Sequence, residues 1–265
     1  MSGRRLAVLG LAMAAASCGW AQDAGDLVAR SIAAEEDNRR RAISWLYREA
    51  VISRFFEKDR LRRRTETNYE VLFVEGQPYY RMTGRDGRPL AGAEKEEEDA
   101  RMQRVAEERR ANPNKIVVSD RPRLAILYRV VPETHEVTLA GSEVVEGRDA
   151  WRLVAKPRRS LAPRETRVLE TRAVDLLIWV DKASLMRVKQ EAVALRNAGR
   201  FRKGDRVTHS FEPHADGGEA PTWLVKRITL RRPFGKNERI EVDQVYSEYR
   251  RFAADSRITI EPQWP

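Results

Sequence analysis

The residues of this chain best suited to chemistry are its three histidines, His135, His209 and His214. His209 and His214 lie five residues apart, with Glu212 and Asp216 close by in the sequence. Imidazole and carboxylate groups bind zinc, but the helical H-E-x-x-H arrangement of zinc hydrolases is not present. The chain also contains no G-x-S-x-G turn and no phosphate-binding glycine loop. The sequence therefore predicts no enzyme, no metal and no cofactor, and leaves a histidine-dependent envelope hydrolase as an alternative.

Cys18 is the only cysteine, so the fold contains no internal disulfide and no cysteine cluster for a metal. It ends an apolar stretch, "LAVLGLAMAAAS", that follows Arg4 and Arg5. A basic start and roughly a dozen apolar residues are typical of a secretory signal peptide and too short to span a membrane. We predict a signal peptide at residues 1–21, cleavage before Gln22 and a periplasmic mature protein.

The sequence around Cys18 permits a second interpretation. "AASC" resembles the lipobox of bacterial lipoproteins, in which the cysteine is lipidated and becomes the first residue of the mature chain. Ala15 stands where that pattern prefers leucine, which favours ordinary cleavage. A membrane-anchored lipoprotein attached through Cys18 is the alternative.

The composition indicates a folded, basic protein. The 265 residues are 42% hydrophobic and 34% charged, with a formal net charge of +10. This length allows one large domain or two small ones. Arginine clusters at 62–64, 158–159, 200–206 and 231–232 either keep the protein soluble or contact an anionic envelope surface such as lipid headgroups. No aromatic-basic nucleic-acid motif is present, so we predict no nucleic-acid partner.

Hydrophobic periodicity predicts an α+β, mainly β fold. Spaced apolar residues indicate a helix from Asp26 to about Tyr47, and three antiparallel strands follow. Residues 92–113 are rich in helix formers and have almost no apolar face, which predicts a solvated helical insertion. The rest of the chain alternates in the manner of strands, giving about ten in one antiparallel sheet.

Residues 176–194 predict a hairpin with an unusually apolar first strand. "LLIWVD" is apolar on both faces, and "DKAS" forms the turn. In the second strand Met186 and Val188 share a face with Ala192 and Ala194. Arg187 and the charged residues that alternate with it occupy the other face. The first strand therefore needs cover on both sides, or lines an apolar space.

This hairpin resembles the central hairpin of the LolA/LolB-like family, which comprises periplasmic carriers of lipoproteins and lipids and relatives that sense envelope state. "GRDAWRLVAKPR" is similar to the preceding strand pair, and "PTWLVKRITL" and "VYSEYRRF" to later strands, so the resemblance spans roughly residues 135–252. It implies that residues 22–265 form one outer-membrane lipoprotein-sorting-like domain. In it, a strongly curved, antiparallel half-barrel sheet would shelter acyl chains in an apolar cavity.

We therefore predict a lipid or an acylated ligand such as a lipoprotein, bound by apolar side chains on the inner face of the sheet. The predicted cavity residues are Val71, Phe73, Val137, Leu139, Trp151, Leu153, Ile178, Val180, Met186, Val188, Val207 and Phe211. The alternative for each of these residues is that it simply forms part of a packed core. The alternative function is a structural or regulatory envelope scaffold that fills its own sheet and contacts a protein partner.

Overall fold

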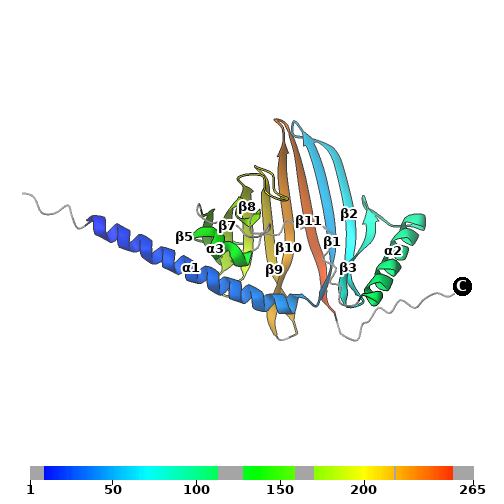
Figure 1. Ribbon diagram of the computed structural model, residues 1–265, viewed down its shortest axis with the longest axis horizontal. Helices are drawn as coiled ribbons and strands as arrows, with labels where there is room; N and C mark the ends of the chain where they lie inside the picture. The colour runs from blue at the N-terminus through cyan, green and yellow to red at the C-terminus, as the bar shows by residue number, and fades with distance from the viewer. Residues whose placement is uncertain (1–8, 113–127, 159–169, 218, 253–265) are drawn as a thin grey trace, which may run out of the picture. The chain divides into compact units, whose positions relative to one another are not determined.

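The structure is a computed structural model that describes residues 9–112, 128–158, 170–217 and 219–252, with side chains from residue 24 onward except at 216 and 219 (Figure 1). The helical elements are α1 (Leu9–Ala42), α2 (Gly92–Ala111), the 3-10 helix η1 (Tyr128–Val130) and α3 (Val131–Thr134). The first strands are β1 (Trp45–Glu57), β2 (Arg60–Val74), β3 (Gln77–Arg85), β4 (Arg88–Pro89), β5 (His135–Val145) and β6 (Arg148–Pro157). The remaining strands are β7 (Val174–Asp181), β8 (Arg187–Ala194), β9 (Arg206–Asp216), β10 (Glu219–Phe234) and β11 (Glu238–Arg251).

The eleven strands pair in the order β4-β3-β2-β1-β11-β10-β9-β8-β7-β6-β5. Neighbours run antiparallel, and β4 and β5 are the two edges, so the sheet is open. This confirms the predicted class, a mainly β fold with an open, half-barrel type of sheet and helices, with one strand more than predicted. None of the helices in the described part of the chain is long and apolar enough to cross a membrane.

The chain forms two compact units. The first contains Met1–Arg40 and Leu124–Glu212, and the second contains Arg41–Arg123 and Pro213–Pro265. The predicted signal peptide, residues 1–21, stays a prediction: residues 1–8 lie outside the described part, and residues 9–21 belong to α1 without described side chains. The prediction of a single domain over residues 22–265 likewise stays a prediction.

In the first unit, α1 buries one face of its C-terminal half. Ala24, Leu27, Val28, Ser31 and Asn38 are buried, and their spacing of three, four or seven residues puts them on one side of the helix. The predicted end of this helix at Tyr47 is wrong. α1 ends at Ala42 because the next residues join the sheet of the second unit, where Trp45 pairs with Arg251 of β11.

The predicted hairpin is confirmed as β7 and β8. Asp181 ends β7 and holds the turn, because its carboxylate accepts hydrogen bonds from the Ser184 backbone N–H at 2.8 Å and hydroxyl at 2.6 Å. The Asp181 N–H donates to the Met186 carbonyl at 2.8 Å. Strand β7 is covered on both faces, as its sequence requires. On one of them, Trp179 donates to the Glu143 carboxylate at 2.7 Å and lies beneath the Lys189 ammonium.

In the second unit, α2 is the predicted inserted helix and most of its residues are exposed, but one side packs against the sheet, so the prediction of a fully solvated helix is wrong. Met102, Val105 and Ala106 of α2 contact a cluster formed by Leu72, Val74 and Tyr79. The helix spans only Gly92–Ala111, and residue 113 of the predicted insertion lies outside the described residues. The sequence pattern did not predict this packed side, because only three apolar residues within about one and a half turns form it in a highly charged segment.

Polar side chains provide the rest of the attachment of α2. The Arg109 guanidinium donates to the carbonyls of Val74, Gln77 and Pro78, at 2.8, 2.8 and 2.9 Å. These carbonyls lie at the end of β2 and the start of β3, so Arg109 connects α2 to the backbone of this hairpin. Arg109 is buried, and burial lowers the pKa of its guanidinium below the usual value.

Candidate functional site

The strand register of the first unit brings most of the predicted cavity residues onto one face of the sheet. Residues directly opposite each other on paired strands point to the same side, and alternate residues of a strand share that side. One row of paired residues across β5 to β9 is Val137, Ala155, Leu176, Ala192 and Val207. The neighbouring row is Leu139, Leu153, Ile178, Gln190 and His209. We call the face that carries these two rows the apolar face.

Nine of the twelve predicted cavity residues lie on the apolar face. Trp151 and Val180 extend it at one end, where they pair with each other, and Val188 and Phe211 alternate with members of the second row. Val71 and Phe73 lie on β2 in the second unit; Val71 pairs with Tyr47 and Tyr80, and the Phe73 ring is 5.0 Å from that of Phe252. Met186 precedes β8 at the end of the turn and is buried.

Burial divides the predicted residues into two groups. Leu153, Ile178, Val180, Val188 and Val207 are at most 1% exposed, and Val71 and Met186 are 3% and 7% exposed. Partly exposed are Phe73, Val137, Leu139, Trp151 and Phe211. The first group therefore packs as a core in this structure, and the second is the part that a molecule from solvent can reach.

A partly buried ion pair lies over the apolar face. The Arg187 Nη2 is 2.7 Å from Glu35 Oε2 of α1, and the Arg187 Nε also donates to this carboxylate. The side chains are only 12% and 20% exposed. The guanidinium lies 4.3 Å from the Tyr128 ring centroid and 4.9 Å from that of Phe211, in the geometry of cation–π contacts. This cluster fastens α1 to β8 within the first unit.

Two further groups border the ion pair. Arg187 donates to the side-chain oxygen of Gln190, whose amide nitrogen is buried and has no hydrogen-bond partner among the described residues. Burial of the phenol raises the pKa of Tyr128 to about 12. The face therefore carries a polar centre with a cation and a free amide donor, surrounded by apolar side chains.

The sequence pattern misplaced Arg187. Strict alternation puts it with Lys189 and Glu191 on the opposite face, and that prediction is wrong for Arg187. The register shifts between Trp179 and Val180, so Arg187 lies opposite Val180 and shares its face. Lys189 and Glu191 keep the predicted side, 2.6 Å from each other. The local sequence contains no pattern that predicts this bulge.

The histidines have aromatic or backbone neighbours. His209 stacks on Phe211, and His214, in the second unit, packs 4.6 Å from the Tyr249 ring. His135 is fully buried between Thr134, whose hydroxyl is 2.8 Å from Nδ1, and the Val174 carbonyl, 3.0 Å from Nε2. Within the described ranges no three histidine, cysteine or acidic side chains come together as metal ligands would.

Because His135 is buried, we expect the protein to lose stability in mild acid. Burial lowers the pKa of its imidazole below the usual 6.5, although the Val174 carbonyl acts in the opposite direction. The unfolded chain therefore takes up a proton before the folded protein does, and the stabilising contribution present above pH 6.5 is lost as the pH falls below it. Urea denaturation at pH 7.5 and at pH 5.5 measures this loss. The free energy of unfolding should fall less between the two pH values in His135→Gln than in the native protein. An equal drop in both proteins would exclude His135 as the cause.

Among the described residues of the second unit is a small pocket with a charged lining. It has a volume of about 230 Å³ and lies between α2 and β3–β4, lined by Met82, Arg85, Leu90, Glu94, Glu97, Glu98, Arg101 and Arg104. Sites for drug-sized ligands are commonly about 300–1,000 Å³ and mainly apolar. This pocket is smaller and lined by three acidic and three basic residues, so it does not suit an acyl chain.

Comparison with known proteins gives structural similarity only. No protein-family model and no curated protein matches the chain. A DUF1329 family protein from Desulfovibrio piger is 15% identical with a TM-score of 0.41, over 89% of this chain and 94% of that one. A LolA superfamily protein from Nitrosomonas europaea is 13% identical with a TM-score of 0.32, over 77% and 85%. The LolA-like superfamily indicated by the sequence is represented among these structures.

A third similar structure is an outer membrane lipoprotein-sorting protein domain from Vibrio parahaemolyticus. It is 12% identical with a TM-score of 0.38, and the match covers 88% of this chain and 94% of that one. At such identities and scores the similarity carries no information about a ligand or a partner. The function has to be inferred from the residues of this chain.

Proposed function

We propose that this chain is an exported envelope protein that binds a lipid or an acylated ligand on the apolar face of β5 to β9, as a carrier or a sensor. The observation that carries the proposal is the register of five consecutive strands, which aligns the predicted residues in two rows. An acyl chain removed from water gains about 0.8 kcal/mol for each buried CH₂ group. A continuous apolar face can supply this without any catalytic group.

The position of α1 suggests how the face is covered. Val137, Leu139, Trp151 and Phe211 are partly exposed and offer the first contacts to an acyl chain, because the remaining members of the two rows are buried. To reach those, a ligand has to displace part of the cover that the Glu35–Arg187 pair fastens. Arg187 and the free amide of Gln190 would then meet an anionic or ester headgroup, which matches their donor character.

A second candidate function is favoured by a specific observation. Five of the predicted cavity residues on the apolar face are at most 1% exposed, as in a core that its own side chains fill. A structural or regulatory scaffold that contacts an envelope protein needs only such a core. The two functions differ in whether the face opens to a ligand.

Lipid extraction and native mass spectrometry of the purified protein distinguish the two functions. The carrier or sensor retains an extractable lipid and binds a fluorescent fatty acid. In Leu139→Arg, which puts a charge at a partly exposed position of the apolar face, we expect at least a tenfold weaker Kd with an unchanged far-ultraviolet spectrum. The matched control is Thr138→Arg, on the exposed opposite face of the same strand. It should bind as the native protein does.

Absence of extractable lipid and of fatty-acid binding in the native protein would favour the scaffold. The same spectra determine the mature N-terminus. A mass that begins at Gln22 corresponds to the predicted cleavage and a freely diffusing protein. A diacylglyceryl-modified Cys18 corresponds to a membrane-anchored receptor.

A further inference from the structure

Two hairpins of the second unit end side by side in a strongly basic tip. The turns of β1–β2 and β10–β11 are joined by a hydrogen bond from the Lys58 N–H to the Asn237 carbonyl, at 2.8 Å. Both turns extend beyond β3 and α2 of the same unit, at the top of Figure 1. We define the hairpin tip as residues 57–64 and 231–239.

The tip contains most of the excess charge of the protein. Its two segments hold nine arginine and lysine residues and three acidic residues, a surplus of six against +10 for the whole chain. Two of the acids are already paired, Glu57 with Arg62 at 2.9 Å and Asp59 with Arg239. The basic residues with no ion-pair partner among the described residues include Lys58, Arg60, Arg63 and Lys236. These four are exposed and able to meet an anionic surface.

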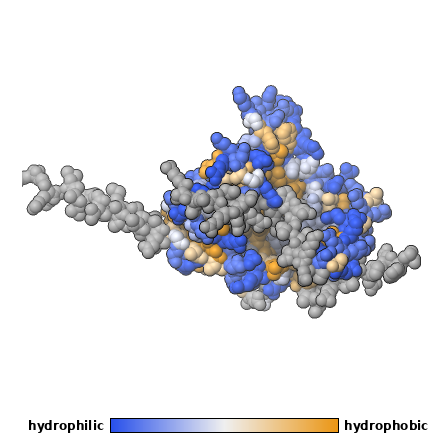
Figure 2. Space-filling model, viewed as in Figure 1, coloured by the Kyte–Doolittle hydropathy of each residue, from blue (hydrophilic) through white to orange (hydrophobic). Residues whose placement is uncertain are grey.

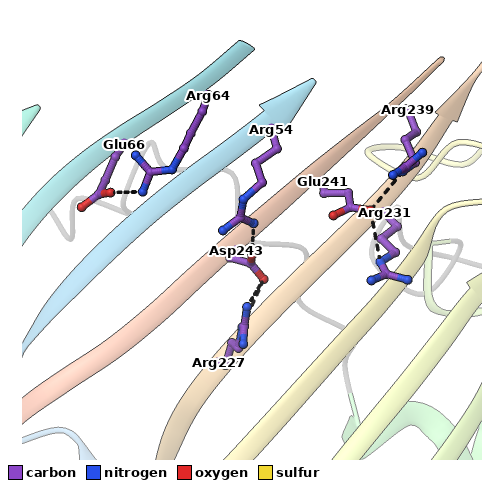
Figure 3. A network of polar contacts seen from close by, with 8 residues as sticks. All are labelled: Arg54, Arg64, Glu66, Arg227, Arg231, Arg239, Glu241 and Asp243. Atoms are coloured by element: carbon purple, nitrogen blue, oxygen red, sulfur yellow. Dashed lines mark hydrogen bonds and ion pairs between the residues drawn. The ribbon is translucent and has the colours of Figure 1, made fainter. Parts of the chain in front are cut away.

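Farther from the turns, the arginines of the same strands, including Arg231 and Arg239 at the base of the tip, are engaged with acids. Asp243 of β11 accepts from Arg54 of β1 and lies 2.8 Å from Arg227 of β10, and this carboxylate is 9% exposed (Figure 3). Glu241 lies 3.6 Å from Arg231 and 3.1 Å from Arg239 (Figure 3). These contacts tie three strands together. They also leave the unpaired positive charge concentrated at the turns.

Apolar side chains are exposed among these cations. Leu61 is 50% exposed and Phe234 is 39% exposed, two of the five large hydrophobic residues exposed in the described part of the chain. Figure 2 shows a hydrophilic surface at the end of the hairpins with hydrophobic surface directly beneath it. Basic residues interleaved with exposed leucine and phenylalanine suit a bilayer interface, where cations meet phosphates and apolar groups reach the headgroup–acyl boundary.

We propose that the hairpin tip docks the protein on the phosphate headgroups of an anionic lipid bilayer. Arg60, Arg63, Lys58 and Lys236 supply the electrostatic attraction, and Leu61 and Phe234 enter the headgroup layer. The β1–β2 and β10–β11 hairpins present the two turns together, because the Lys58–Asn237 hydrogen bond joins them. This site is separate from the apolar face of the first unit, and its existence does not depend on ligand binding there.

Sedimentation of the full chain with vesicles tests the proposal. Binding should be strong to equal parts phosphatidylglycerol and phosphatidylcholine, weak to pure phosphatidylcholine, and reduced by 0.5 M salt. Each basic residue near an anionic membrane contributes about 1 kcal/mol, so Arg60→Gln with Arg63→Gln should weaken binding about 30-fold. The matched control is Arg88→Gln with Arg104→Gln, which removes the same charge from exposed positions of the unit outside the tip. It should bind within about threefold of the native protein.

A second variant separates insertion from attraction. Leu61→Ser with Phe234→Ser keeps every charge, so vesicle binding should weaken while its salt dependence stays the same. Equal losses in the tip and control variants, or equal binding to neutral vesicles, would overturn the proposal. So would tighter binding to a duplex DNA oligonucleotide than to anionic vesicles at the same salt, with the same sensitivity to the tip variants. Fatty-acid binding is measured in the same variants and should not change.

Discussion

Replacement of Arg187 by alanine is expected to lower the free energy of unfolding by about 3–5 kcal/mol, measured by urea denaturation at pH 7. The substitution leaves the Glu35 carboxylate, 20% exposed, without its charged partner. It also removes the hydrogen bond to Gln190 and the contacts with the rings of Tyr128 and Phe211. A partly buried carboxylate left without its partner is more costly than the pair itself, because water solvates it only in part.

The matched control is Lys189→Ala, two residues along the same strand on the opposite face. Lys189 pairs with Glu191 at 2.6 Å, with side chains 31% and 36% exposed, and exposed pairs of this kind contribute about 1 kcal/mol or less. A second check is the double variant Arg187→Met with Glu35→Leu. It removes both charges at once and should recover most of the stability lost in Arg187→Ala. If Lys189→Ala is as damaging as Arg187→Ala, the Glu35–Arg187 pair is not what fastens α1.

Replacement of Glu98 by alanine should lower the free energy of unfolding by about 3 kcal/mol, since it removes the acceptor of the buried Tyr79 hydroxyl and of the partly buried Met82 N–H. The carboxylate of Glu98 accepts from the Tyr79 hydroxyl at 3.0 Å, the Met82 N–H at 3.1 Å and the Arg101 guanidinium at 2.7 Å. It therefore joins α2 to β3 where the apolar contact is small. Glu97→Ala, its exposed neighbour, is the control and should change stability by no more than about 0.5 kcal/mol.

The pH dependence gives Glu98 a second signature. Burial by itself raises the pKa of the carboxyl, but the hydrogen bonds from Arg101, Met82 and Tyr79 outweigh it and hold the pKa below the usual 4.5. The folded protein then releases this proton more readily than the unfolded chain. The contribution of Glu98 is present above pH 4.5 and is lost as the pH falls below it. Between pH 5.5 and 3.5 the free energy of unfolding should fall less with decreasing pH in Glu98→Ala than in the native protein. An equal fall in both proteins would contradict this role.

Local patterns determined most of the strands and the composition of the candidate site. Alternation from Val137 to Phe211 predicts strands whose apolar members share a side, and the observed register places nine of the twelve predicted residues on the apolar face. The β7–β8 hairpin follows from its sequence because Asp181 and Ser184 form the turn with hydrogen bonds between near neighbours. Signals within a few residues suffice wherever the interaction itself is local.

Other features depend on residues far apart in the chain, which no local pattern records. α1 ends at Ala42 because residues more than 200 positions away provide the strand that pairs with Trp45. α2 packs on the sheet through Glu98 and Arg109, whose partners lie 16 to 35 positions earlier in β2, β3 and their turn. Alternation alone predicts a polar surface position for Arg187, and only the bulge opposite Val180 turns it onto the apolar face to meet Glu35, 152 positions earlier. The sequence thus determined which residues are apolar and how they alternate, while the tertiary structure decided which charges become buried, since burial depends on the partner that folding brings to each of them.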